Sequence, residues 1–176
     1  WIGKTALMLL HNALGQETAA ARVSCFGSTS RTIEIAPGVN FEQRPLSTLD
    51  ALDCRPTLLL HLAFLTMDKI QEMEKAEYVR RNRALSEVVH DALDLIGVDR
   101  LFVASSGAAA FAEDAQAAPA LRLYGRLKLE DEERFATWAT RDPARLRVAI
   151  ARIYSVSGPF INKHETYALA SFILAV

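Results

Sequence analysis

A tyrosine and a lysine stand four residues apart in the segment Tyr124-Gly125-Arg126-Leu127-Lys128. On a helix this spacing places both side chains on one face, so a phenol and an ammonium can reach the same ligand. The pKa of a free phenol is about 10, and a neighbouring cation lowers it by favouring the phenolate. Such a pair suits proton transfer to or from a hydroxyl or carbonyl oxygen. Alone it is weak evidence, because an ordinary amphipathic helix has the same spacing.

Alternating strand and helix patterns surround this pair. Short apolar runs typical of strands cover residues 21–26, 32–35, 57–63, 100–104 and 147–153. Helical periodicity covers residues 2–14, 46–52, 67–96, 118–140 and 164–174. This alternation with short connections predicts an α/β fold of the Rossmann type, a doubly wound parallel sheet with right-handed crossovers.

Charge and composition exclude several classes of partner. The 176 residues carry a formal net charge of −1, and Lys and Arg are spread along the chain. This argues against nucleic acid or an anionic membrane as the main partner. No apolar run reaches membrane-spanning length and no signal peptide opens the sequence, so we expect a cytoplasmic protein. Cys25 and Cys54 offer neither a disulfide framework nor a metal-binding spacing.

Further motifs occur in order around the tyrosine and lysine. One strand ends in His61-Leu62-Ala63, Asn82 lies in the helix after it, the next strand ends in Ser105-Ser106-Gly107-Ala108, and Arg152 and Gly158-Pro159 follow the last strand. Together these motifs resemble the extended short-chain dehydrogenases/reductases, the NAD(P)-dependent epimerase/dehydratase family that acts mainly on nucleotide sugars. The resemblance covers nearly the whole chain. We expect His61 to be a satisfied histidine at a strand end and Asn82 to be structural.

The resemblance implies a catalytic site made of Ser106, Tyr124 and Lys128. Tyr124 would give or take the proton at the substrate oxygen. Lys128 would lower the pKa of that phenol and bind the nicotinamide ribose. Ser106 would bind the same substrate oxygen.

The segment after Ser106 departs from the family pattern. Ala110 and Phe111 stand where a tyrosine and a glycine are usual. If Phe111 were instead the aromatic residue, Gly107 would fall at the serine position and the hydroxyl would be lost. We prefer the first alignment because residues 100–106 match it continuously.

The resemblance also implies a nicotinamide dinucleotide cofactor. Gly3 matches the last glycine of the turn that binds the pyrophosphate at a helix N-terminus. Leu62 and Ala63 would lie behind the nicotinamide ribose. An acidic residue after the second strand favours NAD, whereas here Ser28 and Arg31 follow that strand and favour NADP over NAD. A polar turn with a solvated arginine is the alternative.

The resemblance implies a dinucleotide-binding domain over residues 1–158, incomplete at its N-terminus, and the start of a substrate-binding domain over 159–176. We therefore expect a longer protein. Ser155 would contact the substrate, and it stands where an asparagine is usual, which puts the usual nucleotide sugar in doubt. Family members often form homodimers through two long helices, here 67–96 and 121–139, although core burial explains their apolar faces equally well.

The predicted function is an NAD(P)-dependent oxidoreductase, epimerase or dehydratase that acts on a nucleotide sugar or a similar carbonyl or hydroxyl substrate. The alternative is a catalytically idle Rossmann-type domain that senses NADP or serves as a scaffold. The altered segment at Ala110 and Phe111, together with Ser155, favours that alternative. A complete glycine-rich turn before Trp1 would favour the enzyme.

Overall fold

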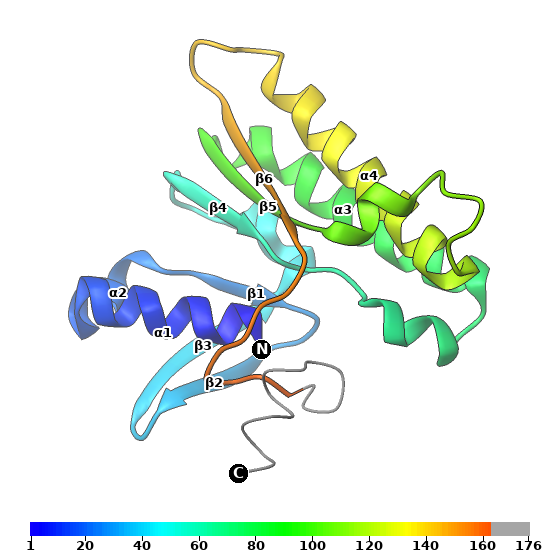
Figure 1. Cartoon of the computed structure of the whole chain (residues 1–176). Coiled ribbons are helices and arrows are strands. Elements are labelled where there is room, and N and C mark those ends of the chain that lie inside the picture. Colours follow the sequence, from blue (N-terminus) through cyan, green and yellow to red (C-terminus); the bar gives the residue numbers. More distant parts are fainter. Residues whose placement is uncertain (163–176) are drawn as a thin grey trace. The chain divides into compact units, whose positions relative to one another are not determined.

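The computed structural model describes residues 1–162, and the chain divides into two units (Figure 1). One unit contains residues 1–46 and the segment from Ser155 onward, and the other contains residues 47–154. The helix expected over 164–174 lies outside the described residues.

The first unit combines two helices with a three-stranded sheet. Helices α1 (Ile2–Leu14) and α2 (Gln16–Arg22) precede strands β1 (Cys25–Gly27), β2 (Arg31–Ala36) and β3 (Val39–Pro45). The strand order is β1-β3-β2, in which β1 runs parallel to β3 and β2 runs antiparallel to it. The core of this unit consists of Leu7, Ala19, Cys25, Ile35 and Phe41.

The sequence patterns do not predict strand β3 or the short helix α2. Strand β3 buries Gln43, which is only 7% exposed, so a polar residue interrupts the apolar alternation that marks a strand. The Gln43 side-chain amide donates to the carbonyl of Thr29 at 2.6 Å, which offsets the cost of its burial. The turn at Pro37-Gly38, with φ of 76° at Gly38, is the available hairpin signal.

The second unit carries the predicted catalytic residues. Strands β4 (Leu58–His61), β5 (Arg100–Ser106) and β6 (Arg147–Ile153) form a parallel sheet in chain order. Helices α3 (Lys75–Leu95) and α4 (Pro119–Ala139) lie side by side, and α4 packs on β5 and β6 (Figure 1). Parallel strands joined by helical crossovers confirm the predicted α/β fold of the Rossmann type.

Short 3₁₀ segments replace parts of the predicted helices. The predicted helix 67–96 is divided into η2 (Met67–Gln71) and α3, and the predicted helix 46–52 is η1 (Leu46–Ala51). Glu74, at the N-cap of α3, has an extended backbone with ψ of 141°, so the helical pattern restarts there. Apolar spacing does not reveal such a break, because it reports which face is buried and not whether the backbone is continuous.

The core of the second unit forms where the two helices meet the sheet. Strand β5 alternates buried and partly buried residues along its length. The buried side chains are at most 2% exposed and include Tyr78, Val89, Leu93, Leu101, Val103, Phe135 and Trp138. Each large apolar side chain buried in this way stabilises the fold by roughly 1.5–3 kcal/mol.

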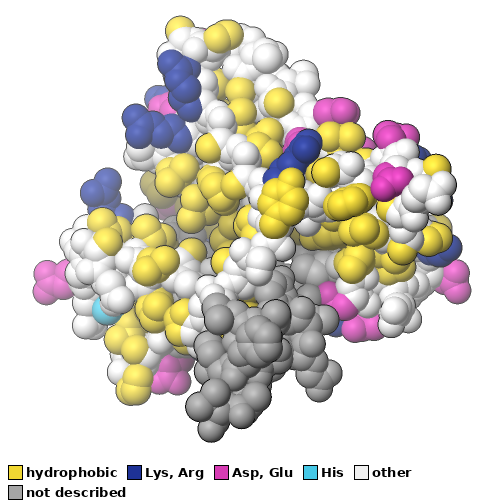
Figure 2. All heavy atoms as spheres, in the orientation of Figure 1, with side chains coloured by type: hydrophobic (Ala, Val, Ile, Leu, Met, Phe, Trp, Pro, Cys, Tyr) yellow, Lys and Arg dark blue, Asp and Glu magenta, His cyan; other side chains and the backbone are white. Residues whose placement is uncertain are grey.

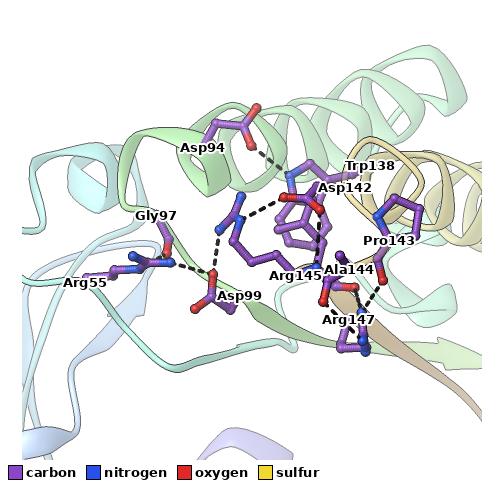
Figure 3. A network of polar contacts seen from close by, with 11 residues as sticks. Arg55, Asp94, Gly97, Asp99, Trp138, Asp142, Pro143, Ala144, Arg145 and Arg147 are labelled. Atoms are coloured by element: carbon purple, nitrogen blue, oxygen red, sulfur yellow. Dashed lines mark hydrogen bonds and ion pairs between the residues drawn. The ribbon is translucent and has the colours of Figure 1, made fainter.

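A polar network surrounds Asp99, directly before β5 (Figure 3). The Asp99 carboxylate accepts from Arg55 at 2.7 Å and from Arg145 at 2.5 Å, and Arg55 also donates to the carbonyl of Gly97 at 2.7 Å. The backbone N–H of Arg147, where β6 begins, donates to the Asp99 carbonyl at 2.8 Å. Because these contacts join the residues leading into β5 and β6, they fix the amino ends of neighbouring strands.

Charged side chains of both signs are scattered among hydrophobic ones on the face shown in Figure 2. Within the part of the chain that the structure describes, no helix is both long and apolar enough to cross a membrane.

Candidate functional site

Tyr124 and Lys128 lie on α4, and Lys128 reaches the carboxyl end of β5. Lys128 is only 4% exposed, and its Nζ donates to the carbonyl of Ala104 at 2.8 Å. The same ammonium lies over the ring of Phe64, 3.6 Å from the ring centroid. The Tyr124 ring meets Phe64 edge to face, with centroids 5.8 Å apart. Phe64 therefore joins the predicted tyrosine and lysine in one cluster.

Ser106 is the last residue of β5, two positions after Ala104. Its Oγ accepts from the backbone N–H of Ala108 at 3.2 Å and caps η3 (Gly107–Phe111). Helix α4 approaches this turn so closely that a Cβ on Gly125 would lie 2.1 Å from the Ala108 carbonyl oxygen. The Ser106 turn is thus packed against the residue that follows Tyr124. Convergence of Ser106, Tyr124 and Lys128, the three groups predicted to be catalytic, on one substrate atom stays a prediction.

Burial and charge act on Lys128 in opposite directions. The pKa of Lys128 is lowered to about 8, because desolvation by burial outweighs the opposing effect of the nearby carboxylates of Asp131 and Glu132. A lysine with this pKa begins to lose its charge just above neutral pH. An ammonium carries three N–H donors, and the Ala104 carbonyl uses one of them.

The segment that carries Phe64 is held by two buried residues of α3. The Tyr78 hydroxyl donates to the Leu65 carbonyl at 2.6 Å, and Asn82 Oδ1 accepts from the Leu65 N–H at 2.8 Å. Burial raises the pKa of Tyr78, so its phenol remains a neutral donor. Asn82 therefore has the structural role that the resemblance implies, and it positions the aromatic ring over Lys128.

His61, at the end of β4, differs from the expectation of a fully satisfied histidine. It is 4% exposed, and among residues 1–162 its Nε2 has no hydrogen-bond partner. Asp131 is 3% exposed, and its Oδ2 likewise has no hydrogen-bond partner in that range. The two atoms lie 3.8 Å apart, beyond hydrogen-bond distance. The expectation was wrong for this nitrogen because strand-end position says nothing about a partner on another element.

Glu132 links α4 to the carboxyl ends of two strands. Its carboxylate accepts from the Ser105 hydroxyl of β5 and pairs with Arg152 of β6 at 2.7 Å. Desolvation, the largest single effect, would raise the pKa of Glu132, but the hydrogen bonds from Arg152 and Ser105 together hold it below its usual value. The carboxylate thus fixes the strand ends beside the predicted site.

Replacing Glu132 by glutamine should lower the free energy of unfolding at pH 7 by about 1–2 kcal/mol, because two charge-assisted hydrogen bonds weaken while Arg152 stays partly solvated. A depressed carboxyl pKa stabilises the fold above the unfolded-state value of about 4.3, and that stabilisation is lost as pH falls through the folded-state pKa. The difference from wild type should therefore fade in acid. Urea unfolding of both proteins at several pH values measures this difference in the free energy of unfolding. The exposed neighbour changed in E133Q should have no effect, and an equal loss in both variants would contradict the assignment.

The sequence patterns do not single out three groups around Lys128, namely Phe64, Asp131 and Glu132. Helical spacing offers a signal for the two acids, because residues three and four positions after a lysine share its face. An acidic run on a helix is also typical of a solvated surface, so this signal is ambiguous. No local pattern relates Phe64 to Lys128.

The residues predicted for the far end of the dinucleotide lie in the first unit. A Cβ at Gly3, in the first turn of α1, would meet no heavy atom within 4 Å, so the backbone there is open to a ligand. Ser28 and Arg31 are exposed in the connection from β1 to β2 and at the start of β2, and Ser155 is exposed as well. Leu62 and Ala63 lie in the second unit, are partly buried, and directly precede Phe64.

Several solved structures share the fold of this chain. MoeE5 in complex with UDP-glucuronic acid and NAD aligns with a TM-score of 0.65 and 22% identity, over 98% of this chain and 59% of that chain. UDP-glucose 4-epimerase from Brucella ovis in complex with NAD gives 0.61 and 19%, over 90% and 50%. UDP-N-acetylglucosamine 4-epimerase from Bacillus cereus gives 0.59 and 17%, over 99% and 62%. The chain thus spans little more than half the length of the first of these proteins.

Comparison of sequences identifies the family of this chain, which the shared fold alone does not. No curated protein matches the chain at a significant level. The model of the NAD dependent epimerase/dehydratase family, however, matches residues 5–176, which include His61, Ser106, Tyr124 and Lys128. The match extends over nearly the whole chain, and the parallel sheet β4-β5-β6 has the strand order that a Rossmann-type fold requires. This chain therefore belongs to the NAD dependent epimerase/dehydratase family.

Proposed function

We propose that the protein is an NAD(P)-dependent epimerase, dehydratase or reductase of a nucleotide sugar, with Ser106, Tyr124 and Lys128 as its catalytic residues. The observation that carries the proposal is the buried Lys128 ammonium, held by the Ala104 carbonyl in the same aromatic cluster as Tyr124. Family membership supports the reaction class. The solved complexes of MoeE5 with UDP-glucuronic acid and with UDP-glucose support the substrate class.

In each unit taken by itself, the residues present suit one part of a nicotinamide dinucleotide. Lys128 offers ammonium donors for ribose hydroxyls, Gly3 leaves the helix start open for the pyrophosphate, and Leu62 and Ala63 precede the aromatic cluster. When bound, the cofactor supplies hydride transfer to and from a substrate carbon. We assign residues 1–158 to its binding domain and 159–176 to the start of a substrate-binding domain.

The chain's own residues handle the proton. Tyr124 donates a proton to the substrate oxygen or accepts one from it, and the Ser106 hydroxyl hydrogen-bonds to that oxygen. The positive charge of Lys128 favours the phenolate and so lowers the pKa of the Tyr124 phenol. Because the pKa of Lys128 is about 8, this help is present near neutral pH and declines in alkali.

Interconversion of epimers tests the proposal. The purified protein is incubated with UDP-glucose or UDP-N-acetylglucosamine and NAD or NADP, and the 4-epimers are separated by chromatography, while reduced nicotinamide is followed by absorbance. Turnover of any UDP-sugar supports the enzyme. Dinucleotide binding without turnover of these sugars would favour the idle sensor or scaffold domain.

Cofactor choice depends on Arg31 and Ser28, both exposed after β1. The guanidinium can pair with a 2′-phosphate, so we expect NADPH to bind more tightly than NADH, although several solved relatives contain NAD. Arg31→Gln should weaken NADPH binding by about tenfold and leave NADH binding unchanged, since one charge-assisted contact is lost. Fluorescence titration measures both affinities. Arg22→Gln, at another exposed arginine of the same unit, is the control, and tighter NADH binding by wild type would refute the preference.

We also propose that the protein forms a homodimer whose interface consists of α3 and α4 of each copy. Helix α3 exposes two apolar side chains, Val88 at 37% and Leu95 at 72%, that a second copy would cover. Burial of such side chains is the usual driving force of association between helices.

A further inference from the structure

A buried carboxylate stands one helical turn after Lys128. Asp131 is three residues further along α4, so both side chains lie on the same face of the helix. Asp131 is 3% exposed, and its Oδ2 lies 3.8 Å from Nε2 of His61. An aspartate buried without a close cationic partner is rare in proteins, so Asp131 is a candidate for a functional role.

The neighbouring acid, Glu132, is compensated in a different way. Arg152 pairs with it at 2.7 Å and Ser105 donates to it, so the field of Glu132 is largely offset by a guanidinium. In the part of the chain that the structure describes, no lysine or arginine lies within ion-pair distance of Asp131. Asp131 is accordingly the larger of the two carboxylate influences on Lys128.

The surroundings of Asp131 keep its field strong. A cavity of only about 10 Å³ adjoins it, lined by Phe64, Asn82 and Ser86 and by the charged side chains of Arg83, Glu130 and Arg134. A cavity needs at least about 10–15 Å³ to hold one water, so solvent cannot screen the carboxylate extensively. Charges in such a desolvated region interact more strongly than charges in water.

We propose that Asp131, which lies beside His61, is a positioning residue for Lys128, because its buried carboxylate keeps the ammonium charged where the Ala104 carbonyl holds it. The proposal rests on the proposed function of Lys128. Other charged or titratable groups face this cluster from each neighbouring element, namely Tyr124, Glu130, Glu132 and Arg134 of α4, Tyr78 and Arg83 of α3, Arg152 of β6 and His61 of β4. Asp131 differs from the other carboxylates in lacking an arginine partner among the described residues.

The charge of Lys128 is measurable in the purified protein by NMR. The chain contains five lysines, so ¹³Cε signals of lysine-labelled protein are few, and Lys128→Met identifies the signal of interest. In Asp131→Asn the midpoint of the Lys128 titration should fall by about one pH unit, because a nearby opposite charge is lost. Asp131→Glu keeps the charge and should keep the midpoint near that of wild type. Glu133→Gln, at an exposed acid of the same helix, is the control and should also leave it unchanged.

The alkaline limb of kcat/KM should move to lower pH in Asp131→Asn by the same amount as the NMR midpoint. A folded Asp131→Asn with an unchanged Lys128 midpoint would overturn the proposal. If that variant does not fold, the same titration is followed in the wild-type protein through the Asp131 ¹³Cγ signal. This signal should show a step in chemical shift at the midpoint of the Lys128 titration. The absence of that step would equally overturn the proposal. NMR needs no turnover, so a protein that shows the expected titration but no activity would refute the proposed function and not this inference.

Discussion

Tyr124→Phe is expected to lower kcat by about a hundred- to ten-thousand-fold, the usual contribution of positioned acid–base catalysis, while dinucleotide affinity stays nearly intact. The substitution removes only the phenolic oxygen. The aromatic ring remains to contact Phe64 edge to face, so the cluster over Lys128 is preserved. Steady-state kinetics on the nucleotide sugar and fluorescence titration with the dinucleotide separate the two effects.

Tyr154 provides the matched control for this experiment. Its side chain is 75% exposed and it follows β6, so Tyr154→Phe removes the same atom from a tyrosine outside the predicted catalytic set. We expect a rate close to wild type for that control. A near-wild-type rate in Tyr124→Phe would remove Tyr124 from the mechanism, whereas equal loss of affinity and rate would indicate damage to the binding site.

Gly125→Ala is expected to be the most damaging small substitution in α4. The new Cβ would lie 2.1 Å from the Ala108 carbonyl oxygen and 2.9 Å from its carbonyl carbon, and both are backbone atoms that cannot rotate away. Overpacking of this kind costs roughly 1–3 kcal/mol of the free energy of unfolding. The helix must move away from η3, which separates Tyr124 from the Ser106 turn, and misplacement by about 1 Å can cost a hundredfold in rate.

Helix propensity alone predicts that Gly125→Ala would increase the free energy of unfolding, because alanine stabilises a helix interior by about 0.5–1 kcal/mol relative to glycine. Gly3→Ala is the comparison in the same chain for which only helix propensity should matter. It also lies in a helix, and its Cβ would meet nothing within 4 Å, so unfolding experiments should find it as stable as wild type or more so. A Gly125→Ala variant that is stabilised and fully active would mean that α4 and η3 are less tightly packed than the structure indicates.

Local patterns were sufficient for the elements that carry the proposed chemistry. Residues 147–153 match β6 at both ends, and the helical pattern over 118–140 matches α4 within one residue at each end. Periodicity reports the buried face of an element, so it also placed Tyr124 and Lys128 on one face of that helix. Strand β3 was not predicted, because its buried Gln43 is polar. The side chain of Gln43 is satisfied by the Thr29 carbonyl, a contact that no hydrophobic pattern records.

The sequence by itself determined the family, the order of most strands and helices, and the residue types available for proton transfer. Only the tertiary structure decided the environment in which those types act. The low pKa of Lys128 comes from burial under Phe64, and it is opposed by Asp131, which packs near His61 of another element. Helical spacing places Asp131 near Lys128, but the burial of both side chains arises from contacts with segments distant in the chain, and a local pattern contains no information on it.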